Sequence, residues 1–326
     1  MKRFYIVLPN SDYGKLMWND LHNIDNIKFI EKPISTKNKL LLFLFKLHFS
    51  FTLNIKCNIP GKKIWRNHYN LSKIDFSINV DNFIIFTDVS LCYYTKEYLD
   101  KLKSSNKNIK LVLMMVNSFH RMKKAIWKQL DSFDLIFSFD ENEANEYGFH
   151  YYPSFYSKKD EENTLYNGLS YNTDCFFVGV AKDRLQKLIN IYDELESLGS
   201  NNEFYIVGVP KREQIPRKGI IYNKWLDYNT VLKKIQQANC ILEVMDGNSA
   251  GVTLRTYEAL CFNKKLITNN QKIKDSPFYN KNYIHVINND NYIPKEFVLE
   301  KDTVDYCYDN RYSPKKFIET LTKLNL

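Results

Sequence analysis

The sequence has few of the residues that interrupt regular structure, with only ten glycines and nine prolines among 326 residues. This scarcity excludes collagen-like and low-complexity chains. Hydrophobic residues make up 44% of the chain and charged residues 25%, which is the composition of a folded globular protein. A chain of this length is expected to form two domains, each large enough to bury its own core.

Several motifs with specific chemistry are also missing. The six cysteines lie far apart and form no C-x-x-C pair, so neither a zinc site nor a redox motif is predicted. The longest apolar stretch, residues 40–49, is interrupted by Lys46 and is shorter than the ~20 residues that span a bilayer. The apolar run at the N-terminus is too short for a signal peptide. We therefore expect a cytoplasmic protein with reduced thiols.

Short apolar runs alternate with amphipathic segments along both halves of the chain, as in parallel sheets with crossover helices. The strands predicted in the first half are residues 4–8, 83–86, 111–116 and 135–139. Those predicted in the second half are residues 175–179, 203–208, 240–244 and 265–268, separated by helices at 184–198, 228–238 and 252–262. Both halves are therefore predicted to be α/β.

The composition of the sequence indicates where the two domains begin and end. Residues 156–163 form a charged, polar stretch with nothing apolar to bury, which is typical of an interdomain linker. The last amphipathic segment has Pro314 at a plausible first helical position. We predict an N-terminal Rossmann-like domain at residues 1–156, a C-terminal Rossmann-like domain at 157–312, and a terminal helix at 313–326.

Glycine followed by cations marks the end of the first strand predicted in the second half. Gly179 is followed by Lys182 and Arg184 and then by a predicted helix, so backbone N–H groups and two cations could bind a diphosphate there. An ordinary strand-to-helix turn with solvated cations explains the pattern equally well. The segment matches neither G-x-G-x-x-G nor a Walker loop, so no standard nucleotide fingerprint applies.

A second candidate site opens the helix predicted at residues 252–262. Gly251 and Thr253 could contact phosphate, Arg255 could bind an oxyanion in bidentate fashion, and Glu258 could accept hydrogen bonds from ribose hydroxyls. The alternative is an Arg255–Glu258 ion pair on a surface helix, since the two residues are three positions apart.

Residues 251–260, GVTLRTYEAL, followed by residues 264–270, KKLITNN, resemble the donor-site signature of bacterial GT-B glycosyltransferases. More narrowly, they resemble the group that acts in lipopolysaccharide and capsular polysaccharide biosynthesis. Residues 137–140, 147–149 and 176–184 resemble that group too, so the similarity extends over most of the chain from about residue 83. The resemblance implies two Rossmann-like domains facing a cleft, with the acceptor bound by residues 1–156 and the nucleotide sugar by residues 157–312.

The resemblance has one departure. Many retaining members of the fold carry a second glutamate eight positions before the one that matches Glu258, and that position is Ala250 here. Whether transfer inverts or retains the anomeric configuration is therefore left open.

Two residues in the first half are candidates for the catalytic base that deprotonates the acceptor hydroxyl. Asp88 and His120 each follow a predicted strand and could lie at its carboxyl end. As alternatives, Asp88 could cap a helix and His120 could be a surface histidine. The chain has no D-x-D pair of the kind that holds a metal in GT-A enzymes. We therefore expect no metal site and no cofactor, with the leaving diphosphate stabilised by Lys182, Arg184 and Arg255.

Trp225 falls where folds of this kind often place the loop beside the nucleobase. It could stack on the base, although burial as a core tryptophan is the favoured alternative.

The sequence therefore predicts a metal-independent glycosyltransferase, most simply a hexosyltransferase, that uses a nucleotide-diphosphate sugar and a saccharide or lipid-linked saccharide acceptor. A sugar-nucleotide epimerase of the same fold is the first alternative. A basic nucleic-acid-binding protein is the second, suggested by the net charge of +9. It is disfavoured because the cations are dispersed among acidic residues along the chain, so nucleic acid is not expected as a partner.

The remaining hypothesis concerns the inner face of the cell membrane. Residues 37–51 interleave leucine and phenylalanine with Lys37, Lys39, Lys46 and His48. A basic amphipathic helix of this kind could lie on an anionic membrane surface as a peripheral anchor. Alternatively its apolar face packs inside the N-terminal domain.

Overall fold

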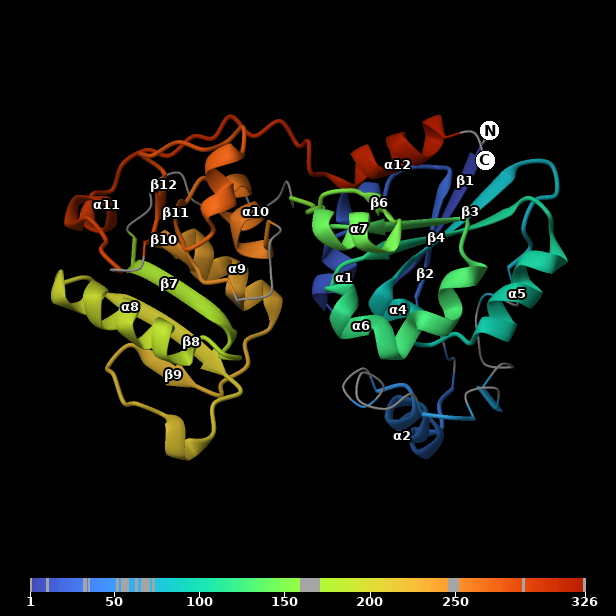
Figure 1. Cartoon of the computed structure of the whole chain (residues 1–326), viewed down its shortest axis with the longest axis horizontal. Helices are drawn as coiled ribbons and strands as arrows, with labels where there is room; N and C mark the ends of the chain where they lie inside the picture. Colours follow the sequence, from blue (N-terminus) through green and yellow to red (C-terminus); the bar gives the residue numbers. More distant parts are fainter. Residues whose placement is uncertain are drawn as a thin grey trace. The chain divides into compact units, whose positions relative to one another are not determined.

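Each half of the chain builds its own sheet from the apolar runs. In the computed structural model the chain divides into two units, Met1–Ser157 with Pro314–Leu326, and Lys158–Ser313 (Figure 1). The residues that the structure describes are 2–9, 12–31, 34, 36–50, 53, 59–61, 64–65, 71, 74–158, 171–245, 252–288 and 291–324. Most of the predicted linker at residues 156–163 lies outside them.

The first unit contains a six-stranded parallel sheet with the strand order β2-β1-β3-β4-β5-β6. Its strands are β1 (Lys2–Val7), β2 (Ile27–Ile30), β3 (Asp81–Thr87), β4 (Ile109–Met115), β5 (Leu135–Ser138) and β6 (His150–Tyr151). Its helices are α1 (Asp12–Leu16), α2 (Lys39–His48), α4 (Asp88–Leu91), α5 (Lys96–Ser105), α6 (Phe119–Ile126), α7 (Glu141–Tyr147) and α12 (Pro314–Lys323), with 3₁₀ turns η1 (Asn19–Leu21) and η4 (Trp127–Ser132).

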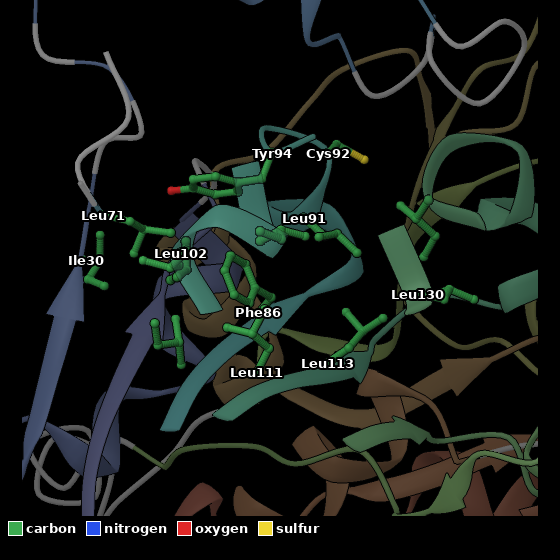
Figure 2. Packing of buried hydrophobic residues seen from close by; sticks show 14 of the residues in the cluster. Ile30, Leu71, Phe86, Leu91, Cys92, Tyr94, Leu102, Leu111, Leu113 and Leu130 are labelled. Carbon is green, nitrogen blue, oxygen red and sulfur yellow. The ribbon is translucent and has the colours of Figure 1, made fainter. Parts of the chain in front are cut away.

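Both faces of this sheet are buried, which explains why its inner strands are continuous apolar runs. On one face Phe86, Leu111 and Leu113 belong to the same cluster as Leu91 and Leu102, which come from α4 and α5 (Figure 2). The alternate residues of the strands form a second cluster on the opposite face.

The C-terminal helix belongs to the first unit. Phe317 of α12 lies 5.1 Å from the ring of Phe137 and 5.4 Å from that of Phe155, measured between ring centroids. Lys2 Nζ donates to the carbonyl oxygen of Thr322 at 2.9 Å. The last helix of the chain, α12, therefore packs on the unit formed by the opposite end of the chain.

The second unit contains another six-stranded parallel sheet, in the order β12-β11-β10-β7-β8-β9. Its strands are β7 (Thr173–Val180), β8 (Asn202–Val207), β9 (Ile220–Tyr222), β10 (Ala238–Glu243), β11 (Lys265–Thr268) and β12 (Ile284–Val286). Its helices are α8 (Leu185–Ser197), α9 (Tyr228–Gln237), α10 (Leu254–Cys261) and α11 (Lys295–Leu299), with 3₁₀ turns η6 (Lys211–Glu213) and η7 (Gln271–Asp275). One face packs against α8 and α11, and the other against α9 and α10.

Candidate functional site

A pocket of about 230 Å³ lies at the carboxyl ends of β7 and β10. From β7 the chain winds outward through β8 to β9, and from β10 it winds in the opposite direction through β11 to β12. The pocket is therefore at the point where the winding direction reverses, which is where open α/β sheets bind ligands. The residues that line it are Phe177, Val178, Lys182, Arg184, Glu243, Val244, Met245, Thr253, Leu254 and Arg255.

Three cations and one carboxylate share this pocket. The cations are Lys182, Arg184 and Arg255, and the carboxylate is Glu243. The structure thus brings together the three cations that the sequence predicts from two segments some 70 residues apart. Their combined charge suits an anionic ligand such as a diphosphate.

Arg184 is held across the ends of the two strands. Its Nη2 donates to the carbonyl oxygen of Val180 at 3.1 Å, and its Nη1 donates to that of Val244. Gly179 lies inside β7, and a Cβ atom there would come within 3.4 Å of Arg184 Nη2 and 3.1 Å of the Phe177 ring. The structure therefore places Gly179 where it leaves room for the guanidinium group, one residue before the strand ends.

Lys182 occupies the turn between β7 and α8. Its backbone has φ = 48°, in the left-handed region, and its side chain is exposed beside the pocket. Helix α8 begins at Leu185. Its N-cap residue, Arg184, makes no capping hydrogen bond with its side chain. The positive end of α8 therefore lies next to two cations, an arrangement that favours anions.

Glu243 is a pocket residue that sequence analysis missed. It ends β10, is 2% exposed, and accepts hydrogen bonds from the hydroxyl groups of Thr253, Thr256 at 2.8 Å and Thr268 at 2.5 Å. These threonines come from α10, its N-cap and β11, so the carboxylate ties three elements together. A carboxylate at a strand end followed by several threonines was the available signal.

Thr253 is the N-cap of α10. Its Oγ1 accepts from the backbone N–H of Arg255 at 3.2 Å and donates its proton to Glu243. A hydroxyl group has a single donor, so in this arrangement Thr253 orients the helix and does not donate to a phosphate. Gly251, predicted beside it, lies outside the residues that the structure describes.

Arg255 and Glu258 form an intrahelical ion pair, which was the alternative prediction for these two residues. Arg255 Nη1 donates to Glu258 Oε2, and the Tyr228 hydroxyl donates to Oε1 at 2.7 Å. Glu258 is fully buried, and burial raises its pKa to about 7 despite the opposing effect of Arg255 and Tyr228. A ribose hydroxyl would have to share carboxylate oxygens that already have partners.

Trp225 follows the carboxyl end of β9 and is 77% exposed. The favoured expectation of a core tryptophan is therefore wrong, because the loop between β9 and α9 carries the indole away from both core clusters of the unit. The exposed ring keeps a face available for stacking.

Asp88 begins α4 at the carboxyl end of β3 and is fully buried. Its Oδ1 accepts from the backbone N–H of Val116 and its Oδ2 from the Asn117 side chain, each at 2.8 Å. Burial raises the pKa of Asp88 to about 6, while these two hydrogen bonds oppose the rise. The carboxylate thus links the ends of β3 and β4.

His120 lies in the first turn of α6 and its side chain is 57% exposed. Its Nε2 is 3.3 Å from Glu146 Oε2, and its Nδ1 is 3.3 Å from the Tyr147 hydroxyl. An imidazole paired with a carboxylate is the arrangement of many general bases. Asp88 and His120 belong to the first unit and the pocket belongs to the second.

No three His, Cys, Asp or Glu side chains among the described residues are grouped so that they could hold a metal ion. No helix in the described part of the chain is both long and apolar enough to cross a bilayer.

No protein-family model matches the chain, and no curated protein matches it in sequence. Solved structures do match it. An alpha-glucosyltransferase in complex with UDP and a 13-mer DNA gives a TM-score of 0.58 at 9% identity, over 99% of this chain and 100% of that one. A putative UDP-N-acetylglucosamine 2-epimerase from Listeria monocytogenes gives 0.53 at 11% identity, over 99% and 96% of the two chains.

The S. aureus MnaA–UDP structure gives a TM-score of 0.52 at 11% identity, over 98% of this chain and 96% of that one. At these identities the likeness concerns the fold. The two parallel six-stranded sheets with their helices form a GT-B fold, as the sequence predicts.

Proposed function

We propose that the protein is a glycosyltransferase that moves a sugar, most simply a hexose, from a nucleotide-diphosphate sugar to a saccharide acceptor. The observation that carries this proposal is the cationic pocket at the carboxyl ends of β7 and β10. Its position in a GT-B fold supports a nucleotide-sugar site, and the sequence resemblance supports a role in bacterial surface polysaccharide synthesis with a lipid-linked acceptor.

In this proposal the pocket stabilises the departing diphosphate. As the bond between the anomeric carbon and the diphosphate breaks, negative charge develops on the phosphate oxygens. Arg184 is already fixed by two carbonyl groups, so it can meet this charge without reorganisation. Lys182 and the positive end of α8 add to the same effect, and Arg255 extends it along the wall of the pocket.

The acceptor hydroxyl needs a base, and the two candidates differ in access. Asp88 is fully buried with both oxygens occupied, whereas the His120 imidazole is 57% exposed and paired with Glu146. We therefore assign His120 as the base and Asp88 as a residue that positions the ends of β3 and β4. His120→Gln should then lower kcat while leaving nucleotide affinity unchanged.

The binding step is tested first with UDP, because the two UDP-bound neighbours make it the natural probe. A ligand at 100 times its Kd adds about 2.7 kcal/mol of stability, so thermal-shift measurements with nucleoside diphosphates will detect a donor site. A chain whose melting temperature responds to no nucleoside diphosphate or nucleotide sugar would contradict the proposal.

The transfer itself should survive EDTA, since cations of the protein meet the charge of the leaving group in this mechanism. The measurement is release of nucleoside diphosphate with and without chelator. Activity that disappears with EDTA and returns with magnesium or manganese would assign the charge to a metal.

A sugar-nucleotide epimerase is the second candidate, because the structural neighbour from Listeria monocytogenes is described as a putative UDP-N-acetylglucosamine 2-epimerase. The two reactions separate cleanly by product. An epimerase changes the configuration of the donor sugar without an acceptor, whereas a transferase releases nucleoside diphosphate in proportion to glycosylated acceptor.

A further inference from the structure

The positive charge of this protein is concentrated in one segment. Residues 32–74 contain nine lysine or arginine residues and no aspartate or glutamate, and the whole chain has a net charge of +9. The rest of the chain is therefore electrically balanced. The interpretation that the cations are dispersed among acidic residues along the chain was wrong for this segment, and an anionic partner has to be sought there.

Exposed apolar side chains gather in the same segment. Twelve large hydrophobic residues of the described chain are exposed, and six of them lie between residues 40 and 64: Leu40, Phe43, Leu44, Leu47, Leu53 and Ile64. Monomeric soluble proteins seldom gather apolar side chains on the surface unless that surface binds something.

Helix α2 has two apolar faces. Phe45 is buried, 5.7 Å from the ring of Tyr93 in a stacked arrangement and 5.3 Å from the ring of Trp65, so this face anchors the helix on the core. The predicted packing inside the N-terminal domain is thus confirmed for one face alone.

The other face of α2 consists of Leu40, Phe43, Leu44 and Leu47, which recur at helical spacing and are 66%, 60%, 44% and 49% exposed. Lys37, Lys39 and Lys46 are exposed beside it. We call these four apolar residues and three lysines the α2 surface.

We propose that the α2 surface docks on a lipid bilayer that contains anionic phospholipids. The four apolar side chains enter the boundary between headgroups and acyl chains, and the lysines contact phosphate groups. This inference rests on the proposed function only for its purpose, which is to bring the enzyme to a lipid-linked acceptor.

Two other partners fit the α2 surface less well. Three of its four apolar side chains are leucines, which offer neither a hydrogen bond nor an aromatic face to a nucleic acid, so Phe43 is its one ring for base stacking. A second copy of the chain would bring two segments of the same charge together, and their repulsion opposes a symmetric contact. A bilayer meets both the apolar and the cationic side chains.

The test is co-sedimentation of the full chain with vesicles of phosphatidylcholine, with or without phosphatidylglycerol. We expect binding to the anionic vesicles at low salt, release as salt rises, and no binding to the neutral ones. Lys39→Glu combined with Lys46→Glu should weaken binding by at least about tenfold. Leu40→Ser combined with Leu44→Ser should weaken it by a similar factor, because the apolar contribution is lost.

Two control variants match these changes within the same unit. Lys101→Glu combined with Lys107→Glu alters net charge equally at exposed positions of the first unit, and Ile78→Ser removes an apolar side chain that is 74% exposed. Both should bind vesicles as the unmodified chain does. UDP thermal shifts should be the same in all variants, so a failure of docking is distinguishable from a failure of the donor site.

Three results would overturn the docking proposal. The first is no binding to anionic vesicles at low salt. The second is an equal loss of binding in the lysine controls, which would show a general charge effect. The third is salt-dependent binding of a nucleic-acid oligomer that the Lys39→Glu and Lys46→Glu changes abolish and the leucine changes leave intact, without binding to vesicles.

Discussion

The two units have the same architecture but differ in charge at the carboxyl ends of inner strands, where the pocket of the second unit has three cations and one carboxylate. In the second unit Lys182, Arg184 and Arg255 gather where the winding direction of the sheet reverses. In the first unit the ends of the neighbouring strands β3 and β4 carry buried carboxylates, since Asp88 follows β3 and Glu143 binds the residues after β4. Strand ends in the same kind of sheet thus carry an excess of cations in one unit and buried carboxylates in the other.

Glu143 binds the start of α6. It accepts from the backbone N–H groups of Phe119 at 2.7 Å and His120 at 3.2 Å, and from the Ser118 hydroxyl at 2.5 Å. These donors form the start of α6, and the N-terminus of a helix attracts negative charge. A carboxylate of the protein therefore occupies the positive end of α6, whereas cations surround that of α8.

The largest expected effect comes from removing an arginine of the pocket in the second unit. Arg184→Ala should weaken UDP binding by roughly ten- to hundredfold, or ~1.5–3 kcal/mol, because a charge-assisted contact to the diphosphate is lost. Arg121→Ala, which removes an exposed arginine near the start of α6, should leave the affinity unchanged. Isothermal titration gives both values. Equal losses in the two variants would place the anion site outside the pocket.

The buried carboxylates of the two units should differ in their tolerance of substitution. Glu143→Gln brings an amide donor against fixed backbone N–H groups, so we expect a loss of about 2–3 kcal/mol of stability. Glu243→Gln should cost about 1 kcal/mol, because the hydroxyl groups of Thr256 and Thr268 can rotate to accept from the amide.

Denaturation of the two glutamine variants in urea measures the difference. A larger loss for Glu243→Gln would mean that the three threonine hydroxyls cannot rearrange, and that the pocket wall is as rigid as the start of α6.

The sequence predicts the inner strands of both sheets and misses all four edge strands, β2, β6, β9 and β12. The reason is physical. An inner strand is buried on both faces and paired on both sides, so it must be a continuous apolar run. An edge strand has one neighbour and is short here, at two to four residues, so it carries too little hydrophobic pattern to be recognised.

The candidate pocket was predictable in part. Lys182, Arg184 and Arg255 follow strand ends in the sequence, and parallel topology brings such positions to one edge. Glu243 was not predicted, because its meaning depends on Thr253, Thr256 and Thr268, which converge only in three dimensions. The exposure of Trp225 was mispredicted for a related reason, since aromatic character alone does not tell a core residue from a loop residue.

The pH dependence of stability should distinguish the units. Burial raises the pKa of Asp88 to about 6 and that of Glu258 to about 7, so both groups stabilise the fold below their unfolded pKa values and lose that contribution as pH rises. Between pH 6 and pH 8 the loss should come mainly from Glu258 and amount to about 1–1.5 kcal/mol.

Calorimetry of the unmodified chain, Glu258→Gln and Asp88→Asn at these two pH values gives the comparison. Glu258→Gln should flatten the fall between pH 6 and pH 8, and Asp88→Asn should leave most of it in place. Identical pH profiles for Glu258→Gln and the unmodified chain would remove Glu258 as its source.

The smallest expected effect compares two exposed tryptophans, Trp225 in the second unit and Trp127 in the first, which are 77% and 51% exposed. Stacking of a base on an aromatic ring contributes ~1 kcal/mol or more, so Trp225→Ala should weaken UDP binding about fivefold. Inorganic pyrophosphate has no base, and its affinity should stay the same. Trp127→Ala should change neither ligand, since its ring lies in the unit without the cationic pocket. An equal loss of pyrophosphate and UDP in Trp225→Ala would show that the indole supports the pocket instead of contacting the base.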